Sequence, residues 1–333
     1  PDEELIDFIN SIGIYTYDIN SYVYPQSLQA SSVMWALNDE IKKLNIDVRF
    51  KALIDKIEYS DGKYELKVLN EQIDALNLVL ACGGASYKSL GGSGIGYTLC
   101  KSLGIECVPL RPSLCGLVTK EDIKILKGVR IKARAKLFDG GYKAGLNAET
   151  EVSSEDGELQ FTDYGISGIM IFNLSGKAGK LIEEGKKPYI VVDFLPDTDD
   201  KIIFESFEKF DNRKPEAVLN SFVNEKLAAF IINEIKALKT SYEIGDIVKK
   251  LHNFKLEINS LTDFENAQVT AGGISLDNIN PDDMSIRSKE GLYAIGELTD
   301  IDGICGGYNL TYAIISGIRA GENINDTNKS DKA

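Results

Sequence analysis

The stretch that decides the fold is GLYAIGELTDIDGICGGYNL, residues 291–310. It opens on an apolar segment that predicts a short buried strand. The carboxylate of Glu297 follows, then a glycine-rich loop, and then a helical pattern over residues 310–323. Free amides at such a helix start favour negative charge, and carboxylates accept hydrogen bonds from hydroxyls. The stretch indicates a site for a cofactor with hydroxyls on one part and negative charge on another, and an ordinary capped helix is the alternative.

A second junction of this kind is LVLACGG, residues 78–84. A backbone without side chains lets a ligand or another segment approach closely, but many α/β strands end in glycine for packing reasons alone. A third block, GGSGIG at residues 91–96, resembles a phosphate loop. It contains no Lys and lacks the Gly-Lys-Ser/Thr ending of such loops, so it predicts a helix start instead.

The composition excludes several classes of function. The 333 residues include 37 Lys and Arg against 51 Asp and Glu, a net charge of −14. This balance argues against nucleic acid as a partner, and the basic segment at residues 124–136 alternates like a strand with one solvated face. The single histidine, His252, leaves multi-histidine metal sites and serine-histidine triads without their central residue. No metal site is predicted, and His252 is expected to cap a helix end.

Other features indicate a cytoplasmic protein without a membrane segment. No apolar run reaches the ~20 residues that a bilayer span needs. The five cysteines form no CxxC pair, which favours reduced thiols. The order and length of the expected strands and helices change near residue 111, where short strands begin to dominate, and again near residue 268. We therefore expect four parts: residues 1–111, an inserted β-rich and helical domain at 112–268, residues 269–325, and a polar, disordered tail at 326–333.

At this point the sequence resembles a known family. The 291–317 stretch closely resembles the cofactor-binding end of BaiN-like, or aminoacetone-oxidase-like, NAD(P)/FAD-dependent oxidoreductases of bacteria. Further segments that match in order and spacing are VYPQSLQASSV, LACGGASYKSLGGSGIGY, LRPSLCGL, ELQFTDYGISG and VTAGGISLDNINPDDMSIRSKEGLY. The resemblance implies an α/β protein with a Rossmann-like FAD-binding domain interrupted by the inserted domain.

The resemblance also implies which residues bind FAD. Ile54 corresponds to a backbone contact with adenine, and Gly83 and Gly84 would pass near the adenosine half. Glu297 and Asp302 would lie near the ribityl and pyrophosphate region, and the amides of residues 307–310 would face the pyrimidine side of the flavin. The full set implied as cofactor-binding is Ile54, Gly83, Gly84, Thr270, Gly272, Gly273, Gly296, Glu297, Asp302, Gly303, Gly306, Gly307, Tyr308, Asn309 and Leu310.

The sequence also departs from the family pattern. The family opens with a strand–helix–strand unit that carries GxGxxG, and no such unit precedes Tyr22. We therefore expect a truncated Rossmann-like domain with impaired FAD binding. Asp163 stands where the family has histidine. Asp163 and Tyr164 are the candidate catalytic residues on the substrate side.

Three functions are compatible with these patterns. The first is a flavoenzyme in which FAD carries the electron or hydride transfer, a small molecule such as an amine or a steroid-like enone is the substrate, and NAD(P)H is a transient donor. The second is a non-catalytic remnant that serves as a scaffold or covers its open sheet edge as a homo-oligomer. The third, a tRNA-modifying flavoprotein, is disfavoured by the net charge.

Overall fold

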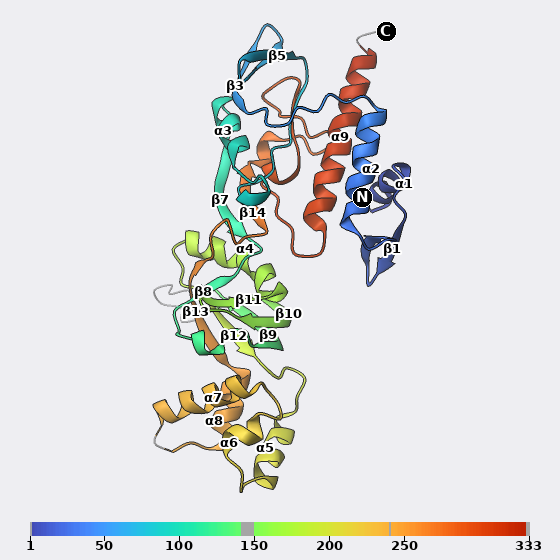
Figure 1. Ribbon diagram of the computed structural model, residues 1–333. Helices are drawn as coiled ribbons and strands as arrows, with labels where there is room; N and C mark the ends of the chain where they lie inside the picture. Colours follow the sequence, from blue (N-terminus) through green and yellow to red (C-terminus); the bar gives the residue numbers. More distant parts are fainter. Residues whose placement is uncertain (1, 141–149, 240, 331–333) are drawn as a thin grey trace. The chain divides into compact units, whose positions relative to one another are not determined.

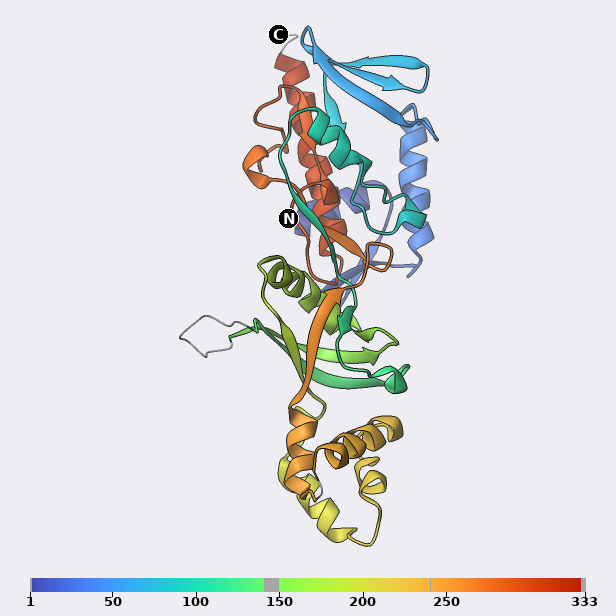
Figure 2. The same cartoon turned by 90° about the vertical axis from the view of Figure 1, so that its left-hand side faces the viewer.

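The computed structural model describes residues 2–140, 150–239 and 241–330, shown in two views in Figures 1 and 2. Its contacts divide the chain into two units. The first consists of Pro1–Ala85, Gly91–Leu110 and Gly272–Ala333, and the second of Ser86–Leu90 and Arg111–Ala271. The chain crosses the division along β7 (Cys107–Ser113) and β14 (Val269–Ile274). The first unit is therefore built from both ends of the chain.

A pair of parallel strands lies at the centre of the first unit. These strands are β6 (Leu78–Leu80) and β15 (Leu292–Ala294), with Leu78 opposite Leu292 and Leu80 opposite Ala294. The side chains of β15 are fully buried, as its continuous apolar run predicts. The other elements of this unit are the hairpin β1 (Thr16–Ile19) and β2 (Tyr22–Pro25), the sheet β3 (Ile54–Ser60), β4 (Lys63–Val68) and β5 (Glu71–Ala75), and the helices α1 (Asp2–Ser11), α2 (Ala30–Lys43), α3 (Ile95–Ser102) and α9 (Tyr308–Ser330).

Local sequence signals account for several of these elements. Asp61 and Gly62 both have positive φ angles, 51° and 76°, and form the two-residue turn between β3 and β4 that their sequence predicts. Helix α9 continues to Ser330, into the polar stretch whose composition predicts no order, and residues 331–333 lie outside the described residues.

Two expectations about the first fifty residues are wrong. The helical spacing of Met34 and Trp35 predicts core positions, yet no residue of α2 is buried and Trp35 is 73% exposed. The apolar run at residues 46–50 predicts a strand, but these residues pair with no other strand in the described parts of the chain. Periodicity indicates a face for burial, whereas burial itself depends on an element that covers this face.

The second unit contains a closed six-stranded barrel. Its strands follow the order β10–β11–β8–β13–β12–β9, and β9 closes the ring by pairing with β10. Alternate side chains fill its interior, among them Ala133, Ala135 and Leu137 of β9. The strands are β8 (Leu117–Thr119), β9 (Arg130–Phe138), β10 (Glu151–Phe161), β11 (Gly165–Ser167), β12 (Tyr189–Asp193) and β13 (Phe254–Leu261).

Helices cover this barrel. Both views place α5, α6, α7 and α8 together on one side of it, whereas α4 (Ile169–Glu183) lies on another side and packs on β10. The four grouped helices are α5 (Asp200–Lys209), α6 (Pro215–Leu219), α7 (Glu225–Leu238) and α8 (Ile244–His252). The spacing of apolar residues over 215–238 predicts one helix, but the structure has two, α6 and α7. The Asn224 side chain caps α7 by accepting a hydrogen bond from the Lys226 amide.

Candidate functional site

The two strand–glycine junctions meet in the first unit. Because β6 and β15 are parallel, their carboxyl ends share one edge of the sheet. The pairing extends past the strands, where the Ile295 amide donates to the Leu80 carbonyl oxygen at 3.1 Å. This brings residues 81–84 beside Gly296 and Glu297. The carboxyl edge of parallel strands is where open α/β sheets bind their ligands.

Helix α3 connects both junctions. The Tyr97 hydroxyl donates to the Glu297 carbonyl oxygen at 3.1 Å, and burial raises the pKa of this phenol, which keeps it protonated as a donor. A Cβ atom on Gly96 would lie 2.7 Å from both Cys82 Cβ and Leu298 Cδ1. The glycine block at residues 91–96 therefore starts a helix, as predicted, and lets that helix pack against both junctions.

An asparagine side chain closes the glycine loop. Asn309 Oδ1 accepts from the Gly303 amide at 2.8 Å, and Asn309 Nδ2 donates to the Gly303 carbonyl oxygen at 3.1 Å. Helix α9 begins at Tyr308, so the amides of its first turn have no partner inside the helix. The Asn309 side chain thus fixes the glycine loop on the first turn of α9, whose backbone amides are hydrogen-bond donors.

Further hydrogen bonds connect the strand end to α9. The Gly296 amide donates to Ser316 Oγ at 3.0 Å, and the Thr299 hydroxyl donates to the Gly296 carbonyl oxygen at 2.9 Å. Tyr312, one turn into α9, places its hydroxyl 2.9 Å from Thr299 Oγ1. The turn that carries Glu297 is thereby fixed on the helix that follows it.

The glycines of the implied site fall into two kinds. A Cβ atom on Gly83 or Gly307 would meet nothing within 4 Å, and both residues have positive φ angles. By contrast, a Cβ atom on Gly272 would lie 2.1 Å from the Pro109 carbonyl oxygen, and one on Gly273 would lie 2.6 Å from that of Leu298. Backbone packing alone explains Gly272 and Gly273, whereas Gly83 and Gly307 leave space that a ligand can fill.

The remaining implied residues are distributed over both units. Ile54 begins β3 in the first unit and packs against its core. In the same unit, Gly306 abuts the Tyr22 ring, where a Cβ atom would lie 2.6 Å from Cε1. Thr270 belongs to the second unit and is fully buried, with its Oγ1 accepting from the Ser86 amide at 3.1 Å.

The candidate catalytic residues also lie in the second unit. Asp163 is exposed and forms an ion pair with Lys127 at 2.6 Å, and this hydrogen bond lowers the pKa of the carboxyl group. The neighbouring Tyr164 packs its ring against Gly116, where a Cβ atom would lie 2.5 Å from the hydroxyl oxygen. Asp163 and Tyr164 thus belong to the second unit, whereas the glycine loop of the implied FAD site belongs to the first.

His252 lies at a helix end, as its sequence context predicts, but its two carboxylate neighbours come from other segments. It ends α8, where Nδ1 lies 2.8 Å from Asp193 Oδ1 and Nε2 lies 3.0 Å from Asp200 Oδ1. These contacts connect a strand end and two helices. Among the described residues, no group of three His, Cys, Asp or Glu side chains could hold a metal ion, and no helix is long and apolar enough to cross a membrane.

The open glycines, the fixed loop and the donor-rich start of α9 suit a dinucleotide cofactor better than a metal or a peptide. The residues present fit FAD in kind, since they offer backbone donors for the flavin pyrimidine and carboxylates for hydroxyls. These features define the class as a Rossmann-type α/β protein with its site at the strand ends. Tyr97, Ser316 and the side-chain role of Asn309 are the parts that sequence patterns miss.

Comparisons with known proteins place the chain more closely. Residues 1–323 match the family described as "HI0933-like protein Rossmann domain". The chain is 32% identical over 331 residues to the 3-dehydro-bile acid delta(4,6)-reductase of Clostridium scindens, covering 96% of this chain and 79% of that protein. The chain belongs to the HI0933-like Rossmann domain family, which confirms the resemblance to BaiN-like flavoprotein oxidoreductases and the α/β Rossmann-like fold class.

More distant relatives have other named activities. The ribosomal RNA dihydrouridine synthase of Escherichia coli is 25% identical over 328 residues, with 93% of this chain and 76% of that protein covered. A solved structure, a flavoprotein/dehydrogenase from Cytophaga hutchinsonii, is 12% identical with a TM-score of 0.30. The alignment covers 96% of this chain but 64% of the Cytophaga chain.

Proposed function

We propose that the protein is an FAD-dependent oxidoreductase that binds its cofactor at the shared edge of β6 and β15 and acts on a small organic molecule. The observation that carries the proposal is the meeting of two strand–glycine junctions with the start of α9 in one unit. Membership in a family of flavoprotein oxidoreductases supports it. FAD, when bound, supplies the redox chemistry, and the chain supplies binding and orientation.

Each part of the site has a proposed task. The backbone at Gly83 and Gly84 approaches the adenosine half, with Ile54 at the adenine. Glu297 and Asp302 accept hydrogen bonds from the ribityl and ribose hydroxyls. The amides at the start of α9 face the flavin pyrimidine, where they stabilise negative charge on the reduced ring. Asn309 holds the loop that carries these amides.

The printed name of the most similar of the relatives described above supports one substrate class over the other. That protein is named as a reductase of a 3-dehydro-bile acid. We therefore favour an apolar enone as substrate over a small amine. NAD(P)H is the proposed transient donor. Asp163 and Tyr164, at the end of β10, remain the proposed residues on the substrate side.

The charge pattern of the barrel supports a small molecule over RNA. The cations on the outer face of β9 pair with acids of β10: Arg134 Nε lies 2.7 Å from Asp156 Oδ1, and Lys136 Nζ lies 3.1 Å from Glu151 Oε2. Arg130 similarly lies 3.4 Å from Glu158. Neutralised side chains release no counterions from a phosphate backbone. This argument separates the proposal from the named activity of the Escherichia coli relative.

We expect weak FAD binding by the chain of 333 residues. Within its described parts, the site stands on two parallel strands, and parallel sheets are normally larger and covered on both faces. The alternative function, a scaffold or homo-oligomer, is favoured by the exposed apolar side chains of α2. Free thiols and the absence of a membrane-spanning helix in the described residues are compatible with the proposed cytoplasmic location.

The test is an equilibrium FAD titration of the purified protein, followed by flavin fluorescence and by the change in visible absorbance. We expect weak, saturable binding to the wild type and a still weaker complex in Gly307→Val, whose added side chain points into the open space of the loop. Val is also strained at the positive φ of this position, so Gly321→Val in α9 serves as a control for effects on the helix. Absence of bound flavin even at saturating FAD would overturn the proposal in favour of the scaffold.

A further inference from the structure

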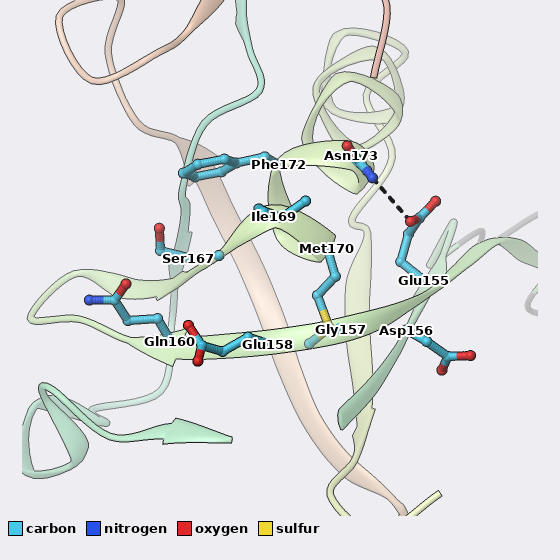
Figure 3. Close-up of a pocket in the computed structure, with 11 residues that line it drawn as sticks. Glu155, Asp156, Gly157, Glu158, Gln160, Ser167, Ile169, Met170, Phe172 and Asn173 are labelled. Atoms are coloured by element: carbon cyan, nitrogen blue, oxygen red, sulfur yellow. Dashed lines mark hydrogen bonds between the residues drawn. The ribbon is translucent and has the colours of Figure 1, made fainter. Parts of the chain in front are cut away.

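The barrel unit contains a pocket that none of the patterns above predicts. It lies between β10 and the first turns of α4, has a volume of about 360 Å³, and is lined by residues of these two elements and of β11 (Figure 3). Its size falls in the range of small-molecule sites. Gly157 and Met170 form the floor of the pocket, where a Cβ atom on Gly157 would lie 3.4 Å from Met170 Cβ, so the helix packs closely on the strand there.

A serine hydroxyl lies in the wall of this pocket. Ser167 ends β11 and is 8% exposed. Its backbone pairs with Gln160, but its hydroxyl makes no hydrogen bond to any residue that the structure describes. The oxygen is not one of the fully buried unpartnered side-chain atoms, so it is open to the pocket. An accessible hydroxyl in the wall of a cavity can bond a polar atom of a ligand.

A carboxylate lies at the other end of the pocket. Three acids line it, and two of them are neutralised on the outer face of the barrel: Asp156 by Arg134 and Glu158 by Arg130. Glu155 instead accepts a hydrogen bond from Asn173 Nδ2 at 3.1 Å, and no cation of the described residues lies within ion-pair distance of it. Glu155 can still accept hydrogen bonds from a donor in the pocket.

Apart from Gln160, the rest of the wall is apolar. Ile169 is 65% exposed at the first position of α4, and Phe172 and Met170 come from the same helix. Figure 3 shows Ser167, Ile169 and Phe172 on the same side of the pocket, away from Glu155. We propose that this pocket binds an organic molecule with an apolar body and a hydroxyl or ammonium donor, and that it rejects anions.

The chemistry of the ligand follows from the wall. The donor of the ligand bonds to Glu155, its apolar body covers Ile169 and Phe172, and a second polar atom reaches the Ser167 hydroxyl. An anion would meet the Glu155 carboxylate without any cation to offset the repulsion. Because every lining residue belongs to the second unit, ligand binding here does not depend on FAD. A negative result would leave the proposed function untouched.

The experiment uses three probes of one shape on the whole chain at neutral pH: cyclohexylamine, cyclohexanol and cyclohexanecarboxylate. Saturation-transfer NMR measures their binding to the wild type, to Glu155→Gln and to Ser167→Ala. The matched controls are Glu151→Gln and Ser154→Ala, which change exposed residues of the same strand outside the pocket. Denaturant unfolding checks that all four variants are folded.

We expect the amine and the alcohol to bind and the carboxylate to fail. Glu155→Gln should weaken the amine by about tenfold or more and the alcohol by less, because a charge-assisted hydrogen bond becomes a neutral one. Ser167→Ala should weaken these probes less than Glu155→Gln does, because each probe carries one polar group and that group bonds to Glu155. Equal binding of the carboxylate, no binding of any probe, or equal effects of the controls would each overturn the proposal.

Discussion

Single side chains hold the candidate site in shape. Asn309 forms two hydrogen bonds with Gly303, and Tyr97 connects α3 to the turn at Glu297. Neither role follows from sequence spacing, because each depends on contacts between segments that the fold brings together. The sequence identifies the glycines but not the role of each one. Gly83 and Gly307 have free space where a side chain would be, whereas Gly272 and Gly273 are required by close backbone packing.

Replacing Asn309 should weaken FAD binding. Asn309→Ala removes both hydrogen bonds to Gly303, and Asn309→Asp keeps the acceptor but turns an oxygen toward the Gly303 carbonyl. We expect up to about thirtyfold weaker binding for Asn309→Ala, which loses two hydrogen bonds worth about 1 kcal/mol each, and roughly tenfold weaker binding for Asn309→Asp. Flavin fluorescence titration measures it. Asn38→Ala, on α2 of the same unit, is the control, and an unchanged affinity in both Asn309 variants would contradict the role of the loop.

Replacing Tyr97 should affect stability. Tyr97→Phe keeps the buried ring and leaves the Glu297 carbonyl without its donor, so we expect a loss of about 1 kcal/mol in the free energy of unfolding. Urea denaturation measures this difference. Tyr59→Phe, at a more exposed position of β3, should be close to neutral. A neutral Tyr97→Phe would show that water replaces the hydroxyl.

At the scale of elements, β9 and β10 illustrate what sequence can predict. The alternation of residues 129–135 predicts a strand with one solvated face, and β9 has it. Its pairing with the acidic strand β10 could not be predicted, because register between strands depends on the whole barrel. The same limit applies to α2, whose apolar face is evident in the sequence but uncovered in the described residues.

The pairing of Arg134 with Asp156 predicts a pH dependence. The hydrogen bond from Arg134 lowers the pKa of the Asp156 carboxyl, so its stabilisation is complete above the unfolded value of about 4 and is lost as the pH falls below it. Because both side chains are solvated, we expect at most about 1 kcal/mol, and less in high salt. Asp156→Asn should reduce the loss of stability between about pH 5 and pH 2 in urea unfolding. An identical pH profile would contradict it.

At the scale of the molecule, each unit has its own apolar core. One core fills the barrel and its helices, and the other surrounds β6, β15 and α3. Two changes of rhythm in the sequence, near residues 111 and 268, predict an inserted domain. No linker-like stretch marks these boundaries in the sequence. The exact division, at Leu110–Arg111 and Ala271–Gly272, follows from the contacts within each unit.

A core mutation should therefore act on one unit. Leu174→Ala in α4 removes a fully buried side chain of the barrel core and should cost about 2–5 kcal/mol. Hydrogen exchange followed by peptide mass spectrometry should show faster exchange in β9, β10 and α4, with β6 and β15 unchanged. Uniform loss of protection across both units would show that they unfold as one.

The exposure of Trp35 has a practical consequence. It is the one tryptophan of the chain and lies on the uncovered face of α2, so its emission should be that of a solvated indole. Any event that covers this face, whether a second copy, a partner or additional polypeptide, would shift the emission to shorter wavelength. The intrinsic fluorescence of the protein is thus a built-in optical probe of whether α2 is used as a contact surface.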